Sequence, residues 1–75
     1  MNKLRRQELG KLCEQIEALK DGLGFIQDDE IEYHDNIPDN LQGGWRYEAS
    51  EEAIDLMDSA ISALEEAYDA LFEMV

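Results

Sequence analysis

Apolar residues in the second half of the chain recur every three or four positions, which is the spacing of an amphipathic helix. A seam of mostly large residues comprises Ile54, Met57, Ile61, Leu64, Tyr68, Leu71 and Val75. A seam of mostly small residues runs beside it and comprises Ala49, Ala53, Leu56, Ala60, Ala63, Ala67, Ala70 and Met74. The other positions are acidic or serine, except Phe72. We predict a helix over about 45–74 that contacts more than one neighbour, because two adjoining seams need two surfaces.

The first half of the chain carries a single seam, which predicts a helix over about 2–35. This seam comprises Leu9, Leu12, Ile16, Leu19, Leu23 and Ile26, and it resumes at Tyr33 and Ile37 after the polar Glu30. Gly22 and Gly24 each cost about 1 kcal/mol relative to alanine inside a helix. The helix is therefore expected to be weak or bent there, and a division into two shorter helices is the alternative.

Between these helices, residues 36–44 read NIPDNLQGG and combine several residues that favour turns. Neither half alternates with period two, so strands are disfavoured. At 1.5 Å per residue both helices reach about 45–50 Å and match as an antiparallel pair. We predict an all-α fold in which residues 1–75 form a single antiparallel two-helix hairpin domain.

A solitary hairpin would leave most of its apolar side chains half exposed. We therefore expect a homodimer that forms a four-helix bundle with the second helices near its centre. A hairpin completed by a different protein is the alternative. The predicted dimer seam comprises Ala53, Ile54, Leu56, Met57, Ala60, Ile61, Ala63, Leu64, Ala67, Tyr68 and Leu71.

Charge changes this picture more than any other property of the chain. The 75 residues include 6 Lys+Arg and 19 Asp+Glu, for a formal net charge of −13. Direct binding of nucleic acid is disfavoured, because phosphates would be repelled. The charge is also uneven, since residues 1–20 carry a net +2 and residues 21–75 a net −15. In an antiparallel hairpin the basic start of the first helix is expected beside Glu65, Glu66, Asp69 and Glu73.

The acids of both helices form the candidate partner-binding surface. This acidic surface comprises Asp28, Asp29, Glu30, Glu32, Glu48, Glu51, Glu52, Asp55, Asp58, Glu65, Glu66, Asp69 and Glu73. Two such rows in a dimer would approach one charge per ~2 Å, close to the ~1.7 Å of duplex DNA. This density suits an inhibitor that mimics nucleic acid and binds a protein with a basic surface. The alternative is an assembly or adaptor subunit that acts through its apolar seams, with acids that serve only solubility.

The sequence offers little support for catalysis. It has no phosphate-binding glycine loop, nucleophile elbow or calcium-loop spacing. Cys13 lies at the edge of the first seam, where a small buried hydrophobic role is expected, and His34 lies beside the turn. We therefore predict no enzyme, no catalytic residues, no cofactor and no metal site. Trp45 either closes the end of the bundle with the neighbouring tyrosines or serves as an exposed anchor for a partner.

The expected location is the cytoplasm. A lone Cys13 cannot form an internal disulfide, which fits a reducing compartment. No apolar run approaches the roughly 20 residues that a membrane span needs, and the polar start MNKLRRQELG is unlike a signal peptide.

The second half also resembles a group of small acidic helical proteins encoded in Gram-positive bacteria and their phages. These proteins carry an N-[ILM]-P-x-[NS]-L-Q turn followed by a Glu-Glu-Ala-Ile-Asp type of helix. The matching residues here are Asn36, Ile37, Pro38, Asn40, Leu41, Gln42, Arg46, Tyr47 and Glu48, then Glu51, Glu52, Ala53, Ile54 and Asp55. The resemblance covers about half the chain. It implies two helices and a mobile-element origin, and it lends no biochemical activity. With this origin, the predicted mimic of nucleic acid is a phage or mobile-element inhibitor of a host protein with a basic surface.

Overall fold

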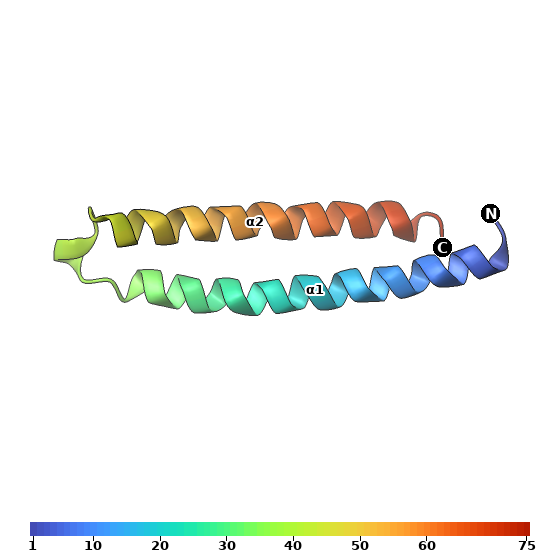
Figure 1. The fold of residues 1–75 in the computed structure, drawn as a ribbon, viewed down its shortest axis with the longest axis horizontal. Coiled ribbons are helices and arrows are strands. Elements are labelled where there is room, and N and C mark those ends of the chain that lie inside the picture. Colours follow the sequence, from blue (N-terminus) through green and yellow to red (C-terminus); the bar gives the residue numbers. More distant parts are fainter.

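The computed structural model describes residues 1–75 as two long α-helices with no β-strand. Helix α1 spans Lys3–Asp35, and helix α2 spans Trp45–Phe72. The two run antiparallel side by side, joined at one end by a connection that contains the short 3-10 helix η1, Asp39–Leu41 (Figure 1). The predicted all-α class with two helices is confirmed. Helix α1 continues through Gly22 and Gly24, so the division into two shorter helices does not occur.

Local hydrogen bonds explain where the helices begin and how the turn is held. The Asn2 side chain accepts a 2.8 Å hydrogen bond from the Arg5 amide and so satisfies a free donor of the first turn of α1. In the connection, the Leu41 amide donates to the Pro38 carbonyl at 2.8 Å. A Cβ at Gly44 would lie 3.2 Å from the Leu41 carbonyl oxygen, so glycine permits the close approach that starts α2. Leu41 itself is 55% exposed.

The face of α1 that contacts α2 differs from the predicted seam. The residues of α1 that are at least half-buried against α2 include Leu9, Cys13, Ile16, Lys20, Leu23, Gln27, Glu30 and His34. Leu12, Leu19 and Ile26 are instead exposed, at 46%, 61% and 60%. Polar residues can occupy this contact because α2 supplies partners. Gln27, for example, donates to the Asp58 carboxylate at 2.6 Å and to the Ile54 carbonyl at 3.3 Å.

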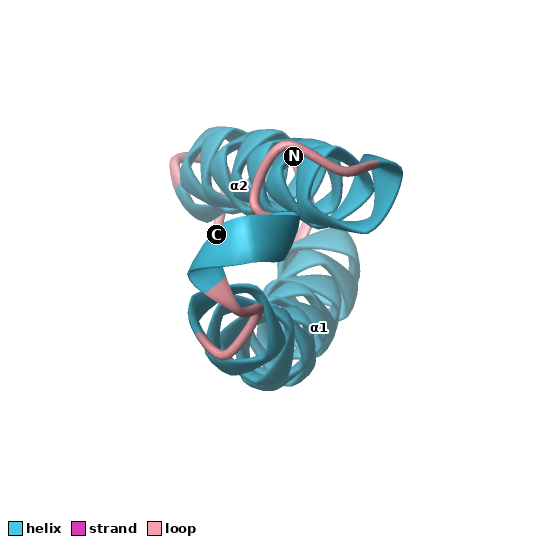
Figure 2. Ribbon diagram, turned by 90° about the vertical axis from the view of Figure 1, so that its left-hand side faces the viewer, coloured by secondary structure: helices cyan, strands magenta, loops and turns pink.

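The hairpin has almost no buried core. It measures 60 × 15 × 12 Å, and only Cys13 and Ser50 are buried, each 4% exposed. In the end-on view, α1 and α2 lie against each other and no further layer covers either one (Figure 2). Small domains need a well-filled core or a partner to be stable. The isolated hairpin therefore lacks the burial that normally stabilises a chain of this size.

Helix α1 extends past the end of α2, so its basic start has few acidic neighbours. A Cβ atom at Gly10 would lie 3.9 Å from the side chain of Val75, the C-terminal residue. The N-terminal end of α1 therefore extends beyond the C-terminus (Figure 1). Of the lysines and arginines, only Lys20 forms an ion pair, at 3.7 Å from Glu65. The expectation that the basic start lies beside Glu66, Asp69 and Glu73 thus fails for Lys3, Arg5 and Arg6. Neither helix contains an apolar stretch long enough to span a membrane.

Candidate interaction surfaces

The predicted acidic surface is almost entirely open to solvent. Eight of its residues lie on α2 from Glu48 to Asp69, a ninth, Glu73, caps the C-terminal end of that helix, and all nine are exposed. Glu48 and Glu73 are separated by about 38 Å along the helix axis, at 1.5 Å per residue. On α1, Asp28, Asp29 and Glu32 are exposed, whereas Glu30 is half-buried. The structure therefore places twelve of the thirteen predicted acids where a partner can reach them.

Few positive charges offset this surface. The Lys20 ammonium group pairs only with Glu65. Arg46 directs its guanidinium group to the Trp45 ring, with Cζ 5.5 Å from the ring centroid. Because carboxylates greatly outnumber bases along α2, the negative potential of this helix is largely uncompensated.

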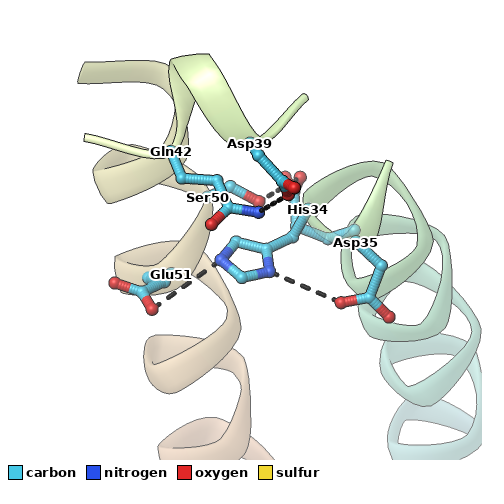
Figure 3. Close-up of polar contacts among 7 residues, drawn as sticks. His34, Asp35, Asp39, Gln42, Ser50 and Glu51 are labelled. Carbon is cyan, nitrogen blue, oxygen red and sulfur yellow. Dashed lines mark hydrogen bonds and ion pairs between the residues drawn. The ribbon is translucent and has the colours of Figure 1, made fainter. Parts of the chain in front are cut away.

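A polar cluster joins the two helices beside the turn (Figure 3). The Ser50 hydroxyl of α2 donates a 3.0 Å hydrogen bond to the half-buried Glu30 carboxylate of α1. His34 reaches from α1 toward α2, where its Nε2 lies 3.7 Å from the Glu51 carboxylate. Its ring also contacts Tyr47, with ring centroids 4.3 Å apart. The cluster holds together the ends of α1 and α2 that the connection joins.

The pairing of Glu30 with Ser50 was not predicted from the sequence, although the sequence carries a signal for it. Glu30 lies seven residues after Leu23 of the first seam, and Ser50 lies seven residues before Met57 of the large-residue seam. Seven residues are two helical turns, so both polar side chains occupy seam positions. A polar residue at a seam position of each helix, near the same turn, indicates that the two residues contact each other.

The aromatic residues near the turn do not close the end of the hairpin together. Trp45 is 75% exposed at the start of α2, and Tyr33 is 49% exposed. Only Tyr47 is half-buried, against His34. Trp45 is thus accessible, as an anchor for a partner would have to be. Phe72 is 59% exposed and stacks on Tyr68, with ring centroids 5.7 Å apart.

The residues of the predicted dimer seam divide into two groups. Ile54, Met57, Ile61, Leu64, Tyr68 and Leu71 are half-buried in the contact with α1. Leu56, Ala60, Ala63 and Ala67 are exposed, and Ala53 is half-buried. The large-residue seam therefore joins the hairpin itself, and mainly the small-residue seam remains available to a further partner.

An open apolar cleft lies between α1 and α2 on the side where Leu19 and Ile26 are exposed. The cleft is lined by Leu19 and Ile26 of α1, by Leu64 of α2, and by Ala18, Gly22 and Leu23. Ala60 and Ala67 lie one turn before and after Leu64 and so share its side of α2. We call the surface formed by Leu12, Leu19 and Ile26 with Ala53, Ala60 and Ala67 the apolar face.

No group of three or more His, Cys, Asp or Glu side chains is placed to hold a metal ion, and Cys13 is a buried free thiol. Desolvation and the neighbouring Glu17 carboxylate raise the pKa of the Tyr68 phenol above its ordinary value of 10.0. The raised pKa keeps this phenol protonated at neutral pH.

Comparison with known proteins identified no match among protein-family models, curated proteins or solved structures.

Proposed function

We propose that this protein is a non-enzymatic, cytoplasmic interaction module that binds a protein with a basic surface through its acidic surface. The observation that supports this proposal is the exposure of twelve of the thirteen predicted acids, against a single lysine paired with them. A surface of one charge sign steers an oppositely charged partner and raises the rate of encounter.

The most specific form of the proposal is mimicry of nucleic acid by a phage or mobile-element inhibitor. Helix α2 presents its carboxylates along about 38 Å, roughly the length of eleven base pairs at 3.4 Å each. A host nucleic-acid-binding protein carries basic groups spaced for phosphates at this scale. The carboxylates would occupy those groups and exclude the nucleic acid.

We further propose that the module acts as a homodimer in a four-helix bundle. Exposed apolar side chains on both helices support this proposal, because a second copy can cover them while the acids remain in water. Trp45 is the proposed anchor that adds apolar contact to the electrostatic attraction.

A second candidate function is favoured by the exposure of Leu12, Leu19 and Ile26. In that case the protein is an assembly or adaptor subunit whose apolar face binds another protein, and the acids only maintain solubility. Binding of this kind would persist at high salt, because it depends on burial of apolar surface rather than on charge.

The test is capture of partners from a Gram-positive host lysate, followed by titration of the purified partner against salt. A variant with Asp55→Lys, Glu66→Lys and Asp69→Lys reverses the charge of three exposed acids. None of the three side chains forms an ion pair or a hydrogen bond within the hairpin. A control with Glu8→Lys, Glu14→Lys and Asp21→Lys changes the net charge equally but lies outside the acidic surface.

The electrostatic proposal expects the partner to bind nucleic acid, to be displaced by duplex DNA and to lose affinity steeply as salt rises. The α2 variant should lose binding by tenfold or more, and the α1 control should retain most of it. Equal binding by the folded α2 variant would contradict the proposal. A partner that is retained at high salt and lost on Leu19→Glu would favour the adaptor function.

A further inference from the structure

We infer that the apolar face binds the same face of a second copy in antiparallel orientation, with Leu19 beside the two-fold axis and α1 packed on α1. This inference deepens the proposed homodimer and depends on it. It differs from the sequence-based expectation, which placed the second helices near the centre. Four features of the hairpin support this arrangement: the polarity of its two sides, the size of the apolar side, the distribution of charge and the heptad positions of α1.

The two broad sides of the hairpin differ in polarity. On one side, the contacts between helices are polar, since Lys20 pairs with Glu65 and Gln27 bonds to Asp58. Phe25, Ile31 and Phe72 are the exposed apolar exceptions there, since Ile31 and Phe72 lie seven residues after Gly24 and Glu65 of that side. On the other side, Leu19, Ile26 and Leu64 line the apolar cleft. One side is therefore suited to water and the other to an apolar partner.

The area of this side suits a stable dimer. Its outline of 60 × 15 Å is long and broad enough to contain the roughly 800 Å² per partner that a standard stable interface buries. A second copy has an outline of identical length and the same apolar face. Two-fold contacts pair one surface patch with itself, so no additional matching surface is required.

Charge selects the antiparallel orientation. Residues 28–52, at the turn end, contain nine acids and one base, whereas Lys3, Arg5 and Arg6 lie at the opposite end of α1. A parallel dimer would place two acidic turn ends together. An antiparallel dimer separates them by most of the 60 Å length, many times the Debye length of about 8 Å at physiological salt. It also brings the free basic end of one copy toward the acidic end of the other.

The heptad positions of α1 set the register. Arg5, Leu12, Leu19, Ile26 and Tyr33 are each seven residues apart and share one line along the helix. With Leu19 at the axis, Leu12 of one copy meets Ile26 of the other. Arg5 then meets Tyr33, a pairing that permits a cation–π contact.

Helix α2 fits the same axis. Leu64 lines the cleft with Leu19, so it lies at nearly the same level along the hairpin. Ala60 and Ala67 lie almost symmetrically about that level, and so Ala60 of one copy meets Ala67 of the other. Their methyl groups allow close approach of the two α2 helices, while the acids of α2 point away from the contact.

Disulfide trapping tests this arrangement in the full chain with Cys13→Ala, which removes the natural thiol. Two cysteines can be bridged only when their Cα atoms lie within about 7 Å. Leu19→Cys is expected to form a covalent dimer on oxidation by copper phenanthroline and oxygen. Leu56→Cys is the matched control, because Leu56 is 63% exposed and Leu19 is 61% exposed. The control should remain uncrosslinked, since Leu56 lies far from its own copy in this register.

A mixture of two variants tests orientation separately. Leu12→Cys and Ile26→Cys, each with Cys13→Ala, should crosslink to each other at least tenfold faster than either crosslinks to itself. Circular dichroism checks that every variant is helical, and light scattering gives the mass of the uncrosslinked chain.

The outcomes distinguish this arrangement from the dimer and from the function. A monomer by light scattering at all concentrations would overturn the dimer and this arrangement together. A dimer that crosslinks at Leu56→Cys and not at Leu19→Cys would overturn the arrangement alone. Neither result bears on the acidic surface, which the charge-reversal variants test.

Discussion

Tyr68 shows how the contact between the helices alters a single side chain. Desolvation, followed in importance by the Glu17 carboxylate of α1, raises the pKa of its phenol above the ordinary value. The folded state then retains a proton that the unfolded chain releases near pH 10. The free energy of unfolding therefore falls as pH rises through 10, because the unfolded state binds fewer protons there.

We expect Tyr68→Phe to remove this part of the alkaline loss of stability. The measurement is urea unfolding of the wild-type protein and the variant at pH 8 and pH 11, followed by circular dichroism. The difference in free energy of unfolding between the two pH values should be smaller for the variant. Tyr33→Phe is the control, because Tyr33 is 49% exposed. An equal alkaline loss in the wild-type protein and Tyr68→Phe would contradict this assignment.

At the same scale, the exposure of the acids was predictable and the position of Glu30 was not. An acid on the polar side of an amphipathic helix, such as Asp55, points to solvent whichever neighbour the helix has. Glu30 interrupts the first seam, and hydropathy alone cannot show whether such a residue turns outward or finds a partner. The outcome depends on Ser50, which lies twenty residues away in sequence.

Among the elements, α2 was easier to predict than α1. The large-residue seam of α2, from Ile54 to Leu71, is the face that contacts α1. For α1, the hydrophobic pattern correctly predicted that Leu9, Ile16 and Leu23 contact α2. It also included Leu12 and Leu19 in the same seam, and these two residues are exposed. A hydrophobic pattern identifies the apolar positions of a helix without showing which neighbour covers them. Gln27 lies in the contact because Asp58 and the Ile54 carbonyl satisfy its amide.

The continuity of α1 leads to a prediction about Gly24. A Cβ at this position would meet no atom within 4 Å, so alanine fits without a clash. We expect Gly24→Ala to raise the free energy of unfolding by about 0.5–1 kcal/mol, since glycine weakens a helix interior by this amount.

The measurement is urea unfolding, and Ala18→Gly on the same helix is the reciprocal control, which should lower the free energy by a similar amount. Loss of stability in Gly24→Ala would mean that α1 depends on a glycine at this position.

The whole molecule combines a large negative charge with very little buried apolar surface. The net charge of −13 repels itself within a hairpin of 60 × 15 × 12 Å, and only Lys20 and Glu65 form a lysine–carboxylate pair. Helix pairing must overcome this repulsion through apolar contact and a few polar contacts, such as those of Gln27 with Asp58 and of Ser50 with Glu30. Salt should therefore stabilise the fold, because it screens the repulsion within the molecule. It should also weaken partner binding, because it screens the attraction to a basic partner.

We expect the midpoint of thermal unfolding to rise as NaCl increases from 10 to 150 mM, whereas binding to a basic partner weakens over the same range. Circular dichroism at fixed protein concentration measures the first effect, and urea titrations provide a check, since guanidinium chloride is itself a salt. The Asp55, Glu66 and Asp69 charge-reversal variant should start from a higher midpoint at 10 mM and gain less from salt, because less repulsion remains to be screened.

A midpoint that falls with salt would show that attractive ion pairs, rather than repulsion, dominate the folded state. The acidic surface would then contribute to stability, and its assignment to partner binding would lose its main support.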